Sequence, residues 1–182
     1  MKIALAQLNY TVGDVEGNAS KVIEAIERAK QKSADLVVFA EQALSGTPAY
    51  DLLNKATFLE LCEEELERIA EHCDTLTAIV GAPVAGEQGT ISAAVIIERG
   101  EITRRIGKRY VDYRDEMGFI TPSTGYEIIT VAGEQVAVVV GNDIVRVHDC
   151  DRSVSTIINI NARRFRKRVL EPRYEKVHHI AY

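Results

Sequence analysis

Two short apolar runs with a helical segment between them open the chain. Residues 3–8 and 35–41 are rich in β-forming side chains, as is typical of strands buried on both faces. Between them, apolar side chains recur at helical spacing, and Asn18 stands at a position that favours a helix cap. The helical stripe consists of Ala19, Val22, Ile23, Ile26 and Ala29. A strand–helix–strand order predicts parallel pairing of the two strands with a right-handed crossover.

The rest of the pattern predicts a second helix and several more strands. Thr57 and Glu60 have the spacing of a capping box, and the helix they predict buries a stripe that includes Cys62 and Cys73. The turns at 98–101 and 132–134 predict two hairpins. The expected strands are 77–84, 91–97, one through Ile102 and Ile106, 127–131, 135–140 and 155–160.

The end of the chain predicts a further helix that starts near Glu171, with Pro172 in its first turn. The sequence shows neither a linker nor an internal repeat. We therefore interpret residues 1–182 as a single domain of the α/β class.

Composition and charge exclude several classes of function. The chain has 182 residues and a net charge of -5, which argues against a surface made for nucleic acid. The basic segment 163–168 is interpreted as a solvated loop or a subunit contact.

The sequence has no secretory signal pattern and no apolar run of membrane-spanning length. Its three cysteines lack disulfide or zinc spacing, which favours a reducing compartment. We expect a soluble cytoplasmic protein without a cofactor or metal.

Glu41 is the first candidate for a functional residue. It ends a run of buried β-formers and precedes a loop that contains Gly46 and Pro48. A carboxylate at the end of a buried strand is costly unless it is used or paired. A structural ion pair with Lys108 is therefore an alternative to a catalytic role. For Lys108 itself, the alternative is a solvated basic patch shared with the neighbouring arginines.

Several spaced blocks of the sequence resemble one enzyme family. They are residues 2–9, 13–14, 34–41, 44–46, 51–53, 108, 115–116, 121–122, 143–144, 157–160 and 174–181. These blocks are similar to the nitrilase (carbon–nitrogen hydrolase) superfamily. Within it they most resemble the glutaminase domains of glutamine-dependent NAD+ synthetases. The resemblance implies a four-layer α-β-β-α sandwich. Because family members continue well past the equivalent of Tyr182, it also implies a fold truncated at the C-terminal end.

The resemblance also implies roles for three positions. The family's general base falls on Glu41, and its lysine, which stabilises the tetrahedral intermediate, falls on Lys108. The position of the family's nucleophilic cysteine falls on Gly141. Amide hydrolysis of this kind needs a nucleophile, a base and a donor for the developing oxyanion. Since glycine offers no nucleophile, we expect amidase activity to be lost or strongly impaired.

Two alternatives stay open at this point. An active hydrolase would use Cys150, with His148 as its base, or a thiol from a partner chain. It would bind a small amide such as glutamine and pass ammonia to a separate synthetase. A loop thiol without a role is the plainer interpretation of Cys150, and a metal site at residues 148–151 is disfavoured. The other alternative is a non-catalytic scaffold or assembly subunit. Because shortening should uncover strand edges, we also predict a homo-oligomer.

Overall fold

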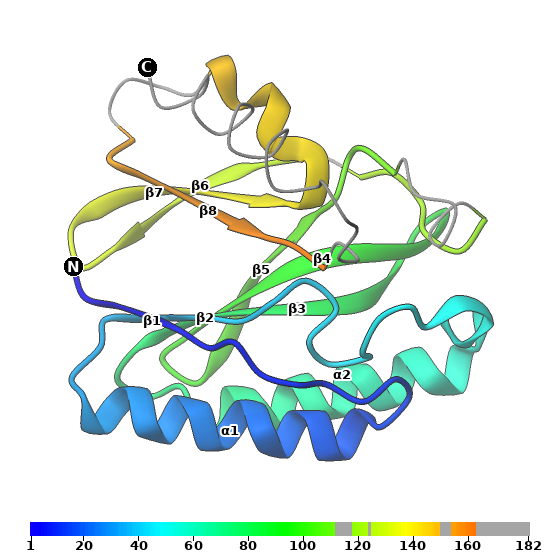
Figure 1. Ribbon diagram of the computed structural model, residues 1–182, viewed down its shortest axis with the longest axis horizontal. Helices are drawn as coiled ribbons and strands as arrows, with labels where there is room; N and C mark the ends of the chain where they lie inside the picture. The colour runs from blue at the N-terminus through cyan, green and yellow to red at the C-terminus, as the bar shows by residue number, and fades with distance from the viewer. Residues whose placement is uncertain (112–117, 124, 150–153, 163–182) are drawn as a thin grey trace, which may run out of the picture.

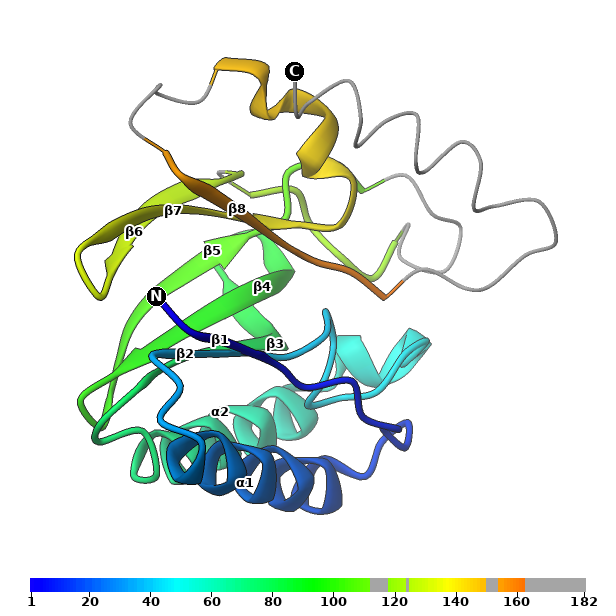
Figure 2. The ribbon, with the colours of Figure 1, turned by 60° about the vertical axis from the view of Figure 1, so that its left-hand side comes forward.

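Two β-sheets face each other, and two helices cover the outer side of the larger sheet (Figure 1). The computed structural model describes residues 1–111, 118–123, 125–149 and 154–162. Helices α1 (Val15–Gln31) and α2 (Ala56–Ala70) lie side by side beneath this sheet (Figure 2). The predicted α/β sandwich is thus confirmed. The helix predicted near Glu171 lies outside the described residues.

Sheet A contains five strands in the order β1-β2-β3-β4-β5. They are β1 (Ile3–Leu5), β2 (Leu36–Val38), β3 (Thr77–Gly86), β4 (Gly89–Glu98) and β5 (Glu101–Gly107). The first three strands run parallel, as the strand–helix–strand order predicts, and β3, β4 and β5 are antiparallel neighbours. The parallel strands β1 and β2 are shorter than the apolar runs that contain them.

Sheet B contains three strands in the order β6-β7-β8. They are β6 (Glu127–Val131), β7 (Glu134–Val140) and β8 (Thr156–Ile160). β6 and β7 form the predicted hairpin, whereas β8 pairs parallel to β7. Two 3₁₀ helices complete the described elements: η1 (Tyr50–Asn54) precedes α2, and η2 (Gly141–Asp149) follows β7.

Side-chain alternation in the strands produces two separate cores. In β2, Val37 points into the core between sheet A and the helices, while Leu36 and Val38 point into the core between the sheets. All three side chains are buried. This two-sided burial explains why the sequence of this strand is continuously apolar instead of alternating.

Both helices begin earlier than their predicted caps. α1 starts at Val15, and the Asp14 side chain accepts a hydrogen bond from the Gly17 amide at 3.1 Å. α2 starts at Ala56, directly after η1, because the Lys55 amide donates to the Leu52 carbonyl at 3.0 Å and the chain is already turning. The predicted caps at Asn18 and Thr57 were therefore wrong.

Asn18 instead connects the first turn of α1 to two loops. Its Nδ2 group donates to the carbonyls of Thr11 at 2.7 Å and Leu44 at 3.0 Å, and its Oδ1 accepts from the Thr11 amide at 2.9 Å. The side chain is fully buried. Asn18 thus fixes the loop that follows Glu41 relative to the helix layer.

We expect Asn18→Ala to lower the free energy of unfolding by about 2–4 kcal/mol, since one donor and two acceptors lose their buried partner. Urea denaturation of the variant measures this loss. Ser20→Ala, on the exposed side of the same helix turn, is the control and should change stability by less than about 0.5 kcal/mol. A loss near 1 kcal/mol for Asn18→Ala would match a simple cap and contradict the bridging role.

Candidate functional site

Three strand ends deliver the predicted residues to one place. Glu41 follows β2, Lys108 follows β5, and Gly141 follows β7. The backbone of Lys108 is held on both sides, because its amide donates to the Ser92 carbonyl and its carbonyl accepts from the Ser123 amide, each at 2.8 Å. Residues from both sheets therefore converge at the carboxyl end of the parallel strands.

Glu41 and Lys108 form a buried ion pair at this point. Lys108 Nζ lies 3.0 Å from Glu41 Oε1, and the two side chains are 0% and 3% exposed. The same Oε1 accepts from Ser92 Oγ at 3.1 Å, and Oε2 accepts from the Ala162 amide at 3.1 Å. All three partners are donors, which compensates for the desolvation of the carboxylate charge.

A relay of buried polar side chains supports the carboxylate. Ser45 Oγ donates to Gln42 Oε1 at 2.7 Å, and Gln42 Nε2 donates to Ser92 Oγ at 3.2 Å. Ser92 then donates to Glu41, so every hydrogen bond in the relay points toward the carboxylate. Sequence reasoning missed Gln42 and Ser92, because residues fifty positions apart give no local signal of their contact.

Gly141 lies directly against the ion pair. Its φ angle of +59° is in the left-handed region, and a Cβ at this position would lie 2.7 Å from Lys108 Cε and 2.9 Å from Nζ. The same Cβ would lie 3.4 Å from Glu41 Oε2. The Lys108 side chain therefore occupies the space into which a side chain at position 141 would extend.

The segments around the pair are tied to each other. Asn159 Nδ2 on β8 donates to the Gly141 carbonyl at 2.9 Å. Asp143 accepts from the backbone amides of Arg109 at 2.7 Å and Tyr110 at 2.8 Å. Burial raises the pKa of Asp143 above its ordinary value, against the opposing effect of these two amide donors. The start of η2 thereby fixes the chain immediately after Lys108.

The two described cysteines are packed in the core between the helices and sheet A. Cys62 lies on α2 and Cys73 follows just after it, and both are buried. Burial raises the pKa of each thiol to about 12, so neither is a ready nucleophile. The alternative nucleophile Cys150 lies outside the described residues, and the backbone of His148 is part of η2.

Among the residues that the structure describes, no group of three or more His, Cys, Asp or Glu side chains could hold a metal ion. Nor is any described helix both long and apolar enough to cross a membrane.

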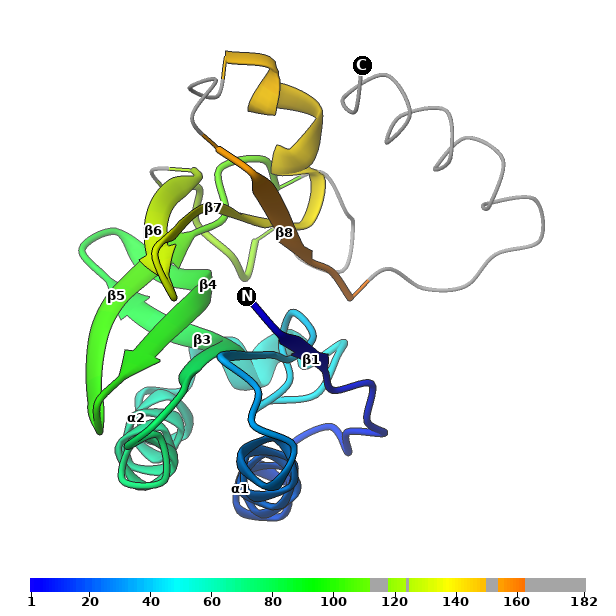
Figure 3. The same cartoon turned by 90° about the vertical axis from the view of Figure 1, so that its left-hand side faces the viewer.

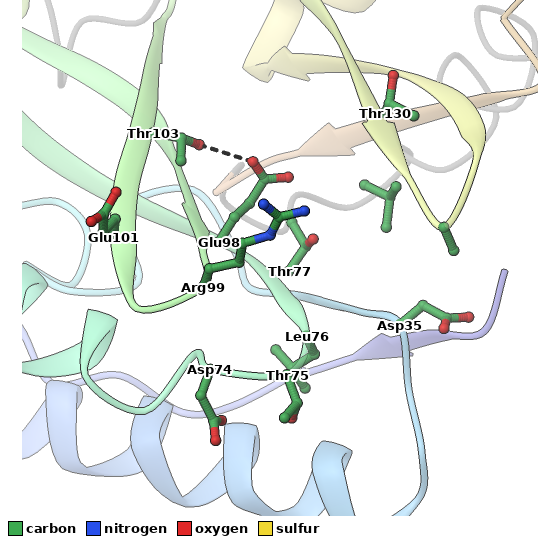
Figure 4. Close-up of a pocket in the computed structure, with 12 residues that line it drawn as sticks. Asp35, Asp74, Thr75, Leu76, Thr77, Glu98, Arg99, Glu101, Thr103 and Thr130 are labelled. Atoms are coloured by element: carbon green, nitrogen blue, oxygen red, sulfur yellow. Dashed lines mark hydrogen bonds between the residues drawn. The ribbon is translucent and has the colours of Figure 1, made fainter.

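A large cleft lies at the opposite end of the parallel strands. Its volume is about 730 Å³. Figure 4 shows carboxylates of Asp35, Asp74 and Glu98 around it, with the Arg99 guanidinium among them. Asp35 precedes β2 and Thr77 begins β3, whereas Glu41 follows β2. The cleft is therefore separate from the ion pair.

Comparison with known proteins identifies the protein family to which this chain belongs. The carbon–nitrogen hydrolase family model matches residues 2–151, and the chain belongs to this family. Glutamine-dependent NAD(+) synthetase from Xanthomonas campestris is 35% identical over 150 residues, which cover 79% of this chain and 27% of the relative. The Thermotoga maritima protein of the same name is 32% identical over 149 residues, covering 79% and 26%. The chain thus spans about a quarter of the length of these relatives.

Solved structures show the same fold. A glutamine-dependent NAD+ synthetase from Acinetobacter baumannii superposes with a TM-score of 0.86 at 21% identity, covering 98% of this chain and 35% of the other. A mutant amidase of the nitrilase superfamily from Nesterenkonia superposes with a TM-score of 0.82 at 18% identity. It covers all of this chain, which corresponds to 71% of the amidase. The nitrilase-type fold inferred from the sequence is confirmed.

We expect Gly141→Ala to destabilise the protein more than Gly133→Ala, as measured by urea denaturation. Both glycines have positive φ angles, but a Cβ at Gly133 meets nothing within 4 Å. Both variants should lose about 1–2 kcal/mol from backbone strain. Only the variant at Gly141 should lose a further ~1–3 kcal/mol, because its methyl group displaces Lys108. Equal losses would show that Lys108 does not fill this space.

Proposed function

We propose that this chain is a nitrilase-type domain without amide hydrolase activity, in which Glu41 and Lys108 serve as an internal ion pair. The observation that carries this proposal is the glycine at position 141. At the position where the family resemblance puts a nucleophilic cysteine, the backbone lies against both charged side chains and offers no side-chain atom.

The arrangement of hydrogen-bond donors around Glu41 supports this interpretation. Lys108 and Ser92 both donate to Oε1, while the Ala162 amide donates to Oε2. A carboxylate oxygen accepts about two hydrogen bonds, so Oε2 retains an acceptor position. A Cβ on Gly141 would lie 3.4 Å from Oε2. In this proposal Oε2 would accept the proton of an acidic side chain at position 141, and glycine has no such side chain.

Loss of the nucleophile is a large effect in hydrolases of comparable chemistry. Removing the attacking side chain from a serine protease lowers turnover by roughly a million-fold. The relatives are named glutamine-dependent NAD(+) synthetases, so glutamine is the first substrate to assay. We propose that ammonia release from glutamine by this chain is at the background rate.

The deciding experiment is Gly141→Cys. We expect an electrophilic glutamine analogue to label this variant stoichiometrically at the introduced thiol, and ammonia release from glutamine to rise above the wild-type rate. The side-chain end of Lys108 must shift to admit the new Cβ, and it is the flexible part of that residue. Mass spectrometry of labelled peptides and an ammonia assay provide the two measurements.

Matched variants make the result specific. Gly141→Ser has the same steric demand without a thiol and should stay unlabelled. Adding Glu41→Gln to Gly141→Cys should slow labelling, because the base is then absent. Ammonia release by the unaltered chain at an ordinary enzymatic rate would refute the proposal. If Cys150→Ser abolished that release, the activity would be assigned to Cys150.

The structural role of the ion pair has its own test. We expect Lys108→Met to lower the free energy of unfolding by about 3–5 kcal/mol, since Glu41 is left as an unpaired buried charge. The double variant with Glu41→Gln should recover part of this loss. As a control, Lys30→Met removes a surface lysine that contacts Glu27 and Asp74 and should cost less than about 1 kcal/mol. A small effect at Lys108 would contradict the structural role.

A further inference from the structure

Two neighbouring strands of sheet A, β3 and β4, determine where Glu41 lies. Both are placed between the helix layer and sheet B (Figure 3). A Cβ on Gly81 of β3 would lie 2.6 Å from Glu41 Cα and 2.8 Å from the Gln42 nitrogen. These are backbone atoms, so no change of rotamer could make room for a side chain at position 81. The Leu44 amide also donates to the Gly81 carbonyl at 3.1 Å. β3 thereby fixes the backbone of the loop that begins at Glu41.

The backbone alone does not fix the orientation of the Glu41 carboxylate. The last torsion of a glutamate side chain is broad and roughly two-fold, so its two oxygens can exchange places at little cost. The ammonium group of Lys108 does not distinguish them, because either oxygen can accept from it. A second donor with a fixed position is needed to decide which oxygen faces position 141.

Ser92 on β4 is this second donor. Its Oγ donates to Glu41 Oε1 at 3.1 Å, and its carbonyl accepts from the Lys108 amide at 2.8 Å. The Ser92 side chain is fully buried. Ser92 therefore contacts both members of the ion pair, and it fixes the carboxylate relative to the backbone that carries the lysine.

Gln42 determines the direction of the Ser92 hydroxyl. Gln42 Nε2 donates to Ser92 Oγ at 3.2 Å, and an amide NH₂ group cannot accept a hydrogen bond. The Ser92 proton is therefore left for Glu41. Gln42 has a φ angle of +58°, in the left-handed region, which is unfavourable for a residue with a side chain. This conformation brings the Gln42 side chain from the loop to β4.

We propose that Ser92 is a positioning residue of this site, which holds Glu41 Oε1 toward Lys108 so that Oε2 faces position 141. Oε2 accepts from the Ala162 amide at 3.1 Å and lies 3.4 Å from the place of a Cβ on Gly141. Position 141 matters here because of the proposed function, on which this inference rests. In this arrangement a serine hydroxyl keeps the base oriented although the nucleophile is absent.

A thermodynamic cycle in the chain that keeps Gly141 tests the contact without any chemistry. Replacing Glu41 and Lys108 together by methionine removes both charges at similar volume, a change that buried ion pairs often tolerate. Urea denaturation then compares Ser92→Ala with the ion pair present and with both methionines in place. We expect Ser92→Ala to raise the unfolding equilibrium constant at least about fivefold more when the ion pair is present.

Thr90→Ala is the matched control for this cycle. Thr90 lies two residues earlier on β4 and is buried, and its Oγ1 donates to the Leu53 carbonyl at 2.6 Å. The variant therefore loses one buried hydroxyl that does not contact the ion pair. Its effect on the unfolding equilibrium constant should be the same in both backgrounds within about twofold.

Labelling of Gly141→Cys by the electrophilic glutamine analogue is the readout that a purely structural role would leave unchanged. At a temperature where every variant is folded, adding Ser92→Ala should slow labelling about tenfold or more, because a misplaced base removes the thiol proton less efficiently. Thr90→Ala in the same background should leave the rate unchanged. Ser92→Thr retains the hydroxyl and should restore most of the rate.

Equal effects of Ser92→Ala in the two backgrounds of the cycle would overturn the positioning role. So would a labelling rate of Gly141→Cys that Ser92→Ala leaves unchanged, or one that Thr90→Ala slows equally. Absence of labelling in Gly141→Cys itself would contradict the proposed function, and the cycle would still decide the role of Ser92.

Discussion

The buried contact between the Glu41 carboxylate and the Lys108 ammonium is the interaction on which the arrangement of the strand ends depends. Glu41 and Lys108 both follow strands of sheet A. Ala162, which follows β8, donates its amide to Glu41, and Gly141, which follows β7, lies against the lysine. One pair of charges thereby holds the ends of both sheets together.

Two charges that are buried away from water are tolerated only when hydrogen-bond donors and acceptors are matched around them. Ser92 supplies one of these partners directly, and Gln42 and Ser45 orient Ser92 from the loop after β2. That loop is in turn connected to α1 through Asn18. The polar network therefore extends from the ion pair to the helix layer. Loss of one of its members removes hydrogen bonds that connect the loop after β2 to its neighbours.

The same site is the basis for the proposal that this chain keeps the family's fold without its amide hydrolysis. The family match covers residues 2–151, and the sequence resemblance assigns the family's base to Glu41 and its lysine to Lys108. Glycine at position 141 permits a left-handed backbone and lets Lys108 approach closely. These two consequences favour a compact ion pair of Glu41 and Lys108, as the proposed structural role requires.

The order of strands and helices, the parallel pairing at the start and the two hairpins were all predictable from the sequence, because apolar periodicity and turn residues act locally. The helix starts were not, since Lys55 continues a turn begun in η1 and Asn18 is engaged by distant loops. The resemblance selected Glu41, Lys108 and Gly141, but their contact depended on how two sheets pack. Only the tertiary structure decided that Lys108 fills the space over Gly141. It also decided that Ser92 and Ala162 donate hydrogen bonds to the Glu41 carboxylate. Such partners are brought together by packing and leave no pattern along the chain.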